Sequence, residues 1–294
     1  MYKSLAEAIR DAEASGRTLS QTALALESKD QGRPVEDIRK ALRRALEVMR
    51  GAVERGLTGD LRSSSGLVGG DAALVFASHA GPMSGTLFSD VLARALAVQE
   101  VNAAMGVIVA APTAGGAGVL PAVLTGVARN KGIADEAVID ALATAGLIGA
   151  VVAERASLSG AEGGCQAETG AAAGMAAGAA TEMLGGSPTQ VGHAVALTMQ
   201  GTLGLVCDPL GGLVELPCVF RNATGSALAL AGIEMALAGI QFAIPVDEVI
   251  DVMGEIGRNM DVRYRETAGG GLAATPTGRR LAKERLVQIR TARG

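Results

Sequence analysis

The chain has 294 residues, of which 49% are hydrophobic and only 2% aromatic, with 41 glycines and no tryptophan. A chain of this length can bury one large core or two small ones, and this core must be built from small and aliphatic side chains. The formal net charge of −4 argues against a nucleic-acid-binding protein, which is normally basic. Closely approaching helices suit this composition, so we expect an all-α fold with a single large Ala/Gly-rich helical domain.

The first sixty residues carry the clearest helical period. Apolar residues recur every three or four positions, at Val35, Ile38, Leu42, Leu46 and Met49, which places them on one face of a helix. The opposite face is basic, and we interpret it as solvated although it could contact a partner. We therefore predict that residues 1–60 form a peripheral helical hairpin. The charged, amphipathic start of the chain is unlike a secretory leader, so we expect a cytoplasmic protein.

From residue 61 the chain changes to a loop of small hydroxyls and glycines, Arg62-Ser-Ser-Ser-Gly-Leu-Val-Gly-Gly-Asp71. Such a loop cannot be the interior of a regular helix. It can present hydroxyl and backbone N–H groups to an anionic ligand. The alternative is a flexible connector, and the residues by themselves leave the two readings open.

Two histidines, His79 and His193, are the only ones in the chain. Imidazole titrates near neutral pH, so each is a candidate proton carrier. His193 follows Ser187-Pro-Thr-Gln190, which predicts a helix start with a capping box and Pro at the first helical position. We interpret His193 as structural and retain His79, beside a Gly-Pro turn, as the candidate catalytic residue.

An uncharged run extends from Ala103 to Ala128 and is long enough on paper for a membrane span. Prolines and glycines divide it, so we interpret it as a helix, a glycine loop and a second helix, with no membrane association. In the loop, Thr113 and the N–H groups of Gly115, Gly116 and the two residues that follow could cradle a small carboxylate at the helix start, with Asn102 nearby. The alternative is a tight turn between helices.

Further helices are expected in four Ala-rich segments, Glu136–Val152, Thr169–Leu184, Pro188–Gln200 and Ala223–Phe242. A polar helix follows Pro245, and strand patterns are nearly absent. The tail at residues 279–294 is basic, and we interpret it as a solvated terminal helix or a subunit contact rather than a nucleic-acid arm.

The three cysteines are Cys165, Cys207 and Cys218, with gaps of 42 and 11 residues between them. These gaps are too long for a compact zinc knuckle, so tertiary structure must gather the thiols. Three thiolates without a local histidine suit a 4Fe-4S cluster in which one iron has no protein thiolate and acts as a Lewis acid. The alternative is three ordinary buried cysteines in a reducing cytosol.

Five segments in this order resemble the bacterial iron-sulfur-dependent L-serine dehydratase (L-serine ammonia-lyase), specifically its alpha chain. They are Ala111-Pro-Thr-Ala-Gly-Gly-Ala-Gly-Val-Leu-Pro121, Ser159-Gly-Ala-Glu-Gly-Gly-Cys-Gln-Ala-Glu168, Leu203-Gly-Leu-Val-Cys-Asp-Pro209, Val214-Glu-Leu-Pro-Cys-Val-Phe-Arg-Asn222 and Tyr264-Arg-Glu-Thr-Ala-Gly-Gly-Gly-Leu-Ala273. The resemblance covers about residues 102–278. In that family three cysteines hold a 4Fe-4S cluster, and Cys165, Cys207 and Cys218 fall at those positions.

The resemblance implies a lyase of amino-acid degradation that converts L-serine to pyruvate and ammonia by dehydration. It makes residues 61–278 the cluster and substrate core. The family places a Gly-Gly-Asp segment near the substrate, which favours a substrate-lining role for Ser63, Ser64, Ser65 and Asp71. Asn102, Thr113, Gly115 and Gly116 are the further candidate substrate contacts.

The resemblance also implies a partner. In the family, function is shared with a beta portion that can be a separate polypeptide and that carries the proposed histidine base. We expect an oligomer of alpha and beta chains with little activity from this chain alone. Some single-chain relatives have Met-Glu-His where this chain has Met199-Gln200-Gly201, and they end in a cysteine where this chain ends in Arg293-Gly294. Both differences resemble the two-chain subtype.

Two rival interpretations remain open at the level of sequence. One is a related cluster-dependent hydro-lyase that acts on another hydroxy acid. The other is a non-catalytic helical scaffold, stabilised by zinc or a cluster, in which the three cysteines and one further group form a closed four-coordinate site.

Overall fold

The computed structural model describes residues 2–78 and 85–292, and this part of the chain is all-α, as predicted. Its α-helices are α1 (Leu5–Ser15), α2 (Leu19–Gln31), α3 (Val35–Gly56), α4 (Asp71–Ala77), α5 (Gly85–Ala103), α6 (Val119–Lys131), α7 (Asp135–Arg155), α8 (Gly160–Gly163), α9 (Ala171–Met183), α10 (Pro188–Met199), α11 (Cys218–Leu237), α12 (Val246–Asn259) and α13 (Pro276–Ala292). A π-helical turn, η1 (Gln166–Gly170), precedes α9, and short 3₁₀ turns connect other elements. Within the described ranges no strand is present, and the pairing of Cys207 with Arg265 is an isolated β-bridge.

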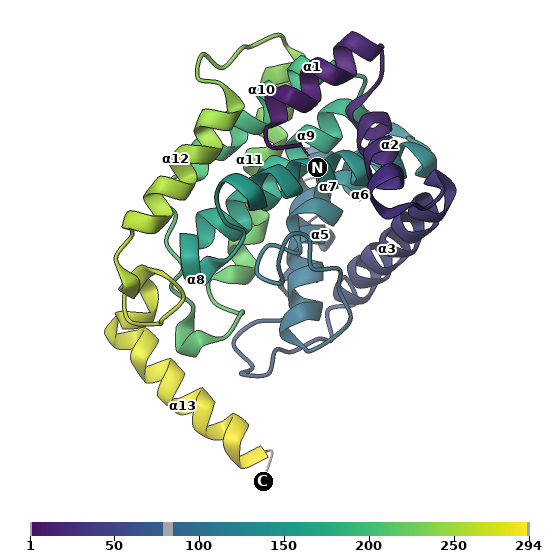
Figure 1. The fold of residues 1–294 in the computed structure, drawn as a ribbon. Coiled ribbons are helices and arrows are strands. Elements are labelled where there is room, and N and C mark those ends of the chain that lie inside the picture. The colour runs from purple at the N-terminus through teal and green to yellow at the C-terminus, as the bar shows by residue number, and fades with distance from the viewer. Residues whose placement is uncertain (1, 79–84, 293–294) are drawn as a thin grey trace.

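The core is organised around α9, whose residues 171–181 are all buried. Nine of its thirteen residues are alanine or glycine, and it packs against α6, α7, α10 and α11 (Figure 1). Small side chains let these helices approach closely: a Cβ added at Gly178 would lie 2.4 Å from Ile148 Cδ1 and 2.9 Å from Val195 Cγ2. In a sequence with few aromatic residues, the core is therefore filled by the close approach of the helices and not by large side chains.

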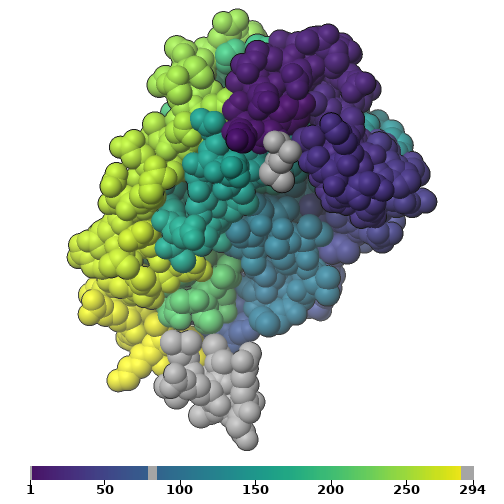
Figure 2. Space-filling view, in the orientation of Figure 1, coloured from purple at the N-terminus to yellow at the C-terminus, as the bar shows by residue number. Residues whose placement is uncertain are grey.

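The first sixty residues form three helices, α1, α2 and α3, where the sequence predicts a two-helix hairpin. The extra break occurs at Gly16, which has φ 63° and ends α1. Leu5 of α1 and Leu19 of α2 are fully buried in the main core. In the space-filling view, the N-terminal segment and the C-terminal segment lie on opposite sides of the face shown, with the middle of the chain between them (Figure 2).

Carboxylates from distant parts of the chain cap the first two helices. Asp247 of α12 accepts hydrogen bonds from Leu5 N at 2.8 Å and Ala6 N at 3.0 Å. Glu182 of α9 accepts from Leu19 N at 2.8 Å, from Ser20 N at 3.1 Å and from the Thr144 hydroxyl at 3.0 Å. Because helix N-termini have unpaired N–H groups and a positive dipole end, these bonds fix both helices on the core.

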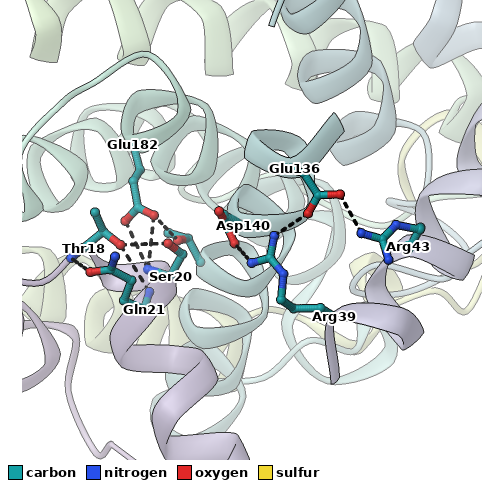
Figure 3. Close-up of polar contacts among 9 residues, drawn as sticks. Thr18, Ser20, Gln21, Arg39, Arg43, Glu136, Asp140 and Glu182 are labelled. Atoms are coloured by element: carbon teal, nitrogen blue, oxygen red, sulfur yellow. Dashed lines mark hydrogen bonds and ion pairs between the residues drawn. The ribbon is translucent and has the colours of Figure 1, made fainter. Parts of the chain in front are cut away.

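Figure 3 shows the Glu182 contact beside a second attachment between α3 and α7. Arg39 binds Glu136 at 2.6 Å and also pairs with Asp140, while Arg43 binds Glu136 at 2.5 Å. These arginines belong to the basic face that the sequence leads us to expect as solvated, and here they contact the neighbouring helix. Partly exposed pairs of this kind contribute little stability individually.

Two predicted helix boundaries differ from the structure. Helix α11 begins at Cys218 and ends at Leu237, where the sequence predicts Ala223 to Phe242. Helix α5 ends at Ala103, so residues 104–118 form an irregular segment where the uncharged run predicts a first helix. Pro121 lies in the first turn of α6, where its missing N–H group would have no intrahelical acceptor.

Among the described residues, one helix, α7, is long and apolar enough to cross a membrane by length and composition alone. Of its most apolar window, 67% is buried inside the protein, chiefly against α9. Packing within the helical core therefore accounts for the apolar composition of α7.

We predict that Glu182→Ala lowers the free energy of unfolding by about 2–4 kcal/mol, because two backbone N–H groups and the Thr144 hydroxyl lose their acceptor. Glu182→Gln keeps an acceptor but not the charge, so its loss should be about half as large. Urea denaturation followed by circular dichroism measures both. The matched control is Glu154→Ala on exposed α7 surface, which should change stability by less than about 0.5 kcal/mol; equal effects of Glu182→Ala and this control would contradict the capping role.

Candidate metal centre

The three cysteines come from three separate elements and are buried together. Cys165 lies between α8 and η1, Cys207 lies in an extended segment, and Cys218 is the first residue of α11. Their exposed fractions are 3%, 2% and 6%, and all three are free thiols. Burial, and then the charges of Cys165, Glu168 and Cys218, raise the pKa of Cys207 well above its usual range. The thiols therefore lie close enough to interact.

Cys207 is held by the segment after α12. Its backbone N–H donates to the carbonyl of Tyr264 at 2.8 Å, and its carbonyl accepts from the N–H of Glu266 at 2.9 Å. These two bonds form the parallel bridge between Cys207 and Arg265. The two segments are almost sixty residues apart in the sequence. They belong to two of the five motifs described above, and the bridge brings these two motifs together.

Cys218 begins α11, so the positive end of the helix dipole is close to its sulfur. Burial is nevertheless the larger influence and raises the pKa of Cys218 to about 12, with a further increase from the charge of Cys165. Without a metal these thiols remain protonated at neutral pH. A bound metal would replace the protons, since thiolates are the ligating form.

A buried ion pair connects the segments that carry Cys207 and Cys218. Arg221, one turn into α11, lies 2.8 Å from Asp208 Oδ1 and donates to the carbonyl of Val206 at 2.8 Å. Asp208 also accepts from the N–H of Leu272 at 2.6 Å. The guanidinium charge of Arg221 opposes the effect of burial on the pKa of both Cys165 and Cys218, so it would stabilise thiolates here.

Glu168 lies between the predicted glycine loop and Cys207 and contacts both. The sequence did not single out this residue. The Thr113 hydroxyl donates to Glu168 Oε1 at 2.7 Å, and Glu168 Oε2 lies 4.0 Å from Cys207 Sγ. Burial raises the pKa of Glu168, the Thr113 hydrogen bond opposes this, and the charge of Glu266 adds to it. One signal was available: Glu168 follows Cys165 by three residues, which is about one helical turn.

Two amides hold the glycine loop between α5 and α11. Asn222 donates to the carbonyls of Gly115 at 2.7 Å and Cys218 at 2.9 Å, and its oxygen accepts from Gly118 N at 2.9 Å. Asn102 donates to the carbonyl of Ala114 at 3.2 Å. The N–H of Gly118 is thus occupied by Asn222, and the carboxylate cradle predicted for this loop can use only its earlier N–H groups, at Gly115 and Gly116.

The serine loop at residues 62–71 is fixed by two buried glutamates. Glu215 accepts from the backbone N–H of Ser65 at 3.1 Å and from its hydroxyl. Glu100 accepts from Gly70 N at 2.8 Å and Ala72 N at 2.9 Å. Burial raises the pKa of Glu100, although both backbone bonds oppose this. The loop is therefore anchored, and the Ser65 hydroxyl is directed to Glu215, three residues before Cys218.

The remaining candidates from the sequence are three residues of the serine loop and the two histidines. Ser63 is buried, Ser64 is exposed, and Asp71 is half-buried at the start of α4. His79 lies outside the described residues. His193 Nδ1 accepts from the backbone N–H of Phe242 at 3.3 Å.

The donor set can be tested against two kinds of metal group. Among the described residues, no three His, Cys, Asp or Glu side chains converge so as to hold one metal ion. A structural zinc site needs four ligands focused on a single point, about 2.3 Å from each sulfur. A 4Fe-4S cluster takes its thiolates on different irons, so the sulfurs are spread around it. The donor set here, three buried thiols beside Arg221, has the soft-ligand chemistry that such a cluster takes.

The chain is thus an all-α protein in which three buried thiols lie beside a glycine loop and the half-buried carboxylate of Glu168. The chain belongs to the serine dehydratase alpha chain family, whose model matches residues 13–273. This confirms the resemblance found in the sequence.

Individual relatives cover most of the chain. It is 48% identical over 286 residues to the probable L-serine dehydratase, alpha chain, of Bacillus subtilis, which covers 97% of this chain and 95% of that protein. It is 39% identical over 262 residues to the L-serine dehydratase, alpha chain, of Peptoniphilus asaccharolyticus, covering 88% and 90%. The L-serine dehydratase of Streptomyces coelicolor is 42% identical over 261 residues, which are 87% of this chain but 57% of that protein.

We predict that Asn222→Ala lowers the free energy of unfolding by about 2–4 kcal/mol, since Asn222 is fully buried and three backbone groups lose their partner. Hydrogen exchange at the N–H of Gly118 should accelerate at least tenfold. The control is Asn259→Ala at the exposed end of α12. Unchanged exchange at Gly118 in Asn222→Ala would show that the loop is held by other contacts.

Proposed function

We propose that this chain is the alpha subunit of an L-serine dehydratase, which converts L-serine to pyruvate and ammonia, and that Cys165, Cys207 and Cys218 hold a 4Fe-4S cluster. The observation that carries the proposal is the burial of three neighbouring thiols in the part of the chain that matches the family. The names of the most similar relatives supply the substrate.

The reaction is an elimination followed by hydrolysis. The Cα proton of serine is removed, and the bond from Cβ to the hydroxyl oxygen breaks, so that water leaves and an enamine remains. The enamine becomes an imine, and water releases ammonia and pyruvate from it. When bound, a 4Fe-4S cluster with one iron free of protein thiolate supplies a Lewis acid for the hydroxyl, which is otherwise a poor leaving group.

The residues of this chain have three tasks in that reaction. The charge of Arg221 and the N-terminus of α11 favour thiolates at Cys165 and Cys218. The proposed substrate side of the site is formed by Thr113, Gly115 and Gly116. These residues contact Glu168, which lies between them and the thiol of Cys207. Asn102 and Ser65 support that side indirectly, because Asn102 binds the glycine loop and Ser65 binds Glu215. Ser64 and Asp71 remain proposed substrate contacts.

We further propose that a separate beta chain completes the active site and supplies the base for the Cα proton. If the base instead belongs to this chain, His79 is the candidate. The relatives from Bacillus subtilis and Peptoniphilus asaccharolyticus are both named as alpha chains. The relative from Streptomyces coelicolor carries no chain designation, and the match to this chain spans 57% of its length. A further portion in that protein is consistent with a function divided between two chains here.

We expect Cys165→Ser, Cys207→Ser and Cys218→Ser each to reduce bound iron and sulfide at least fivefold after anaerobic reconstitution, because a hydroxyl is a much harder ligand than a thiolate. Iron and sulfide analysis with EPR of the reduced protein measures the loss, and far-ultraviolet circular dichroism confirms the fold. A full cluster in all three variants would remove the ligand assignment. Tight stoichiometric zinc in place of iron would support the scaffold interpretation.

The reconstituted chain should show a change in its absorption spectrum, and after reduction in its EPR spectrum, with L-serine and a smaller one with D-serine. Pyruvate formation should rise at least a hundredfold when a beta chain from a relative of the same family is added. Turnover by this chain alone at the rate of the mixture would contradict the two-chain proposal. Spectra that respond to another hydroxy acid but not to L-serine would favour a different hydro-lyase.

A further inference from the structure

We propose that Glu168 binds the α-ammonium group of the substrate, so that the site selects a 3-hydroxy acid with a 2-amino group over one without it. This inference rests on the proposed function and specifies the substrate class at the same site. It starts from the position of the Glu168 carboxylate, which lies between the glycine loop and the cysteine sulfurs.

The space for this carboxylate depends on two glycines from different segments. A Cβ added at Gly115 would lie 2.8 Å from both Glu168 oxygens. A Cβ added at Gly160 would lie 2.6 Å from Glu168 Oε2 and 3.1 Å from Cys207 Sγ. Any larger residue at either position would displace the carboxylate from the sulfurs. The chain thus leaves room for a charged side chain at the point where substrate and thiols would meet.

The carboxylate of Glu168 has no cationic partner within the described residues. The salt bridges of the described residues include nearby Asp208, which pairs with Arg221, but not Glu168. A partly buried carboxylate without a counter-charge is unfavourable, and a bound cation would relieve that penalty. Glu266 adds a second negative charge close by. The local field therefore favours a cation, and an ammonium group is the cation that an amino acid brings.

An ammonium group at Glu168 would also orient the rest of the substrate. One oxygen of Glu168 is already fixed by the Thr113 hydroxyl, while the other faces Cys207. A substrate held there by its nitrogen has its hydroxyl-bearing carbon within a few bond lengths of the thiols. Its carboxylate would be repelled by Glu168 and directed away from it, toward the N–H groups of Gly115 and Gly116 or beyond. A charge-assisted bond of this kind is directional as well as strong.

The test compares two ligands that differ only at the group in question, L-serine and L-glycerate, in which a hydroxyl replaces the ammonium. Binding is measured as the change in the EPR spectrum of the reconstituted alpha and beta mixture after reduction, and L-serine turnover is measured in parallel on the unreduced mixture. For Glu168→Gln, the dissociation constant and KM for L-serine should rise about 10- to 100-fold, as expected for one charge-assisted bond. Binding of L-glycerate should stay the same or become tighter.

Two matched variants separate this role from others. Thr113→Val removes the hydrogen bond to Glu168 but keeps its charge, so discrimination between the two ligands should survive. Glu162→Gln changes an exposed glutamate on α8 and should match the unmodified protein. Iron and sulfide content is measured for every variant and should be unchanged. If Glu168→Gln assembles poorly, Glu168→Asp, which retains the charge, should keep the preference for L-serine.

Three outcomes would overturn the inference. Equal weakening of L-serine and L-glycerate in Glu168→Gln would make Glu168 an anchor for the glycine loop only. Loss of iron from that variant would indicate that Glu168 is a cluster ligand. Unchanged L-serine binding would show that Glu168 has no role in recognition. By contrast, an unmodified protein that binds a cluster but does not respond to L-serine would remove the proposed function itself.

Discussion

The burial of three thiols beside a half-buried carboxylate is the constraint on which the centre of this molecule depends. Each group is unfavourable in a low-dielectric interior, and the charge of Glu168 further raises the pKa of all three thiols. The structure offsets this with a guanidinium charge from Arg221, the N-terminus of α11, and hydrogen bonds from Thr113 to Glu168 and between Cys165 and Thr169. A cationic metal group would offset it further.

A second theme is the use of carboxylates to fix distant backbone. Asp247, Glu182, Glu100 and Glu215 each accept at least one backbone N–H from a segment far away in the sequence. The chain has few aromatic residues with which to anchor its loops. Its core helices carry mostly small side chains, which offer few projections for the outer segments to pack around. Charge-assisted bonds to helix starts and loop backbones supply that specificity. They also link the serine loop to Cys218 through Glu215.

Much of the fold was predictable from local signals. The helical class followed from composition, and the start of α10 followed from Ser187-Pro-Thr-Gln190, whose capping box and proline the structure confirms. Prediction failed where a helix end depends on distant contacts. Helix α11 begins at Cys218 because Glu215, Asp208 and Asn222 fix its first turn. The basic face of α3 was expected to be solvated because the partner acids on α7 are almost a hundred residues away.

The order of residues was enough to establish the helical class and the family and to single out the three cysteines as candidates, because periodicity, helix caps and contiguous motifs act over a few positions. It could not place Glu168 against Thr113 and Cys207, pair Cys207 with Arg265, or direct Arg221 to Asp208. Those contacts join segments that are brought together only when the small-residue helices pack, and chain separation carries no information about them. The charge balance of the site is consequently a property of the folded molecule.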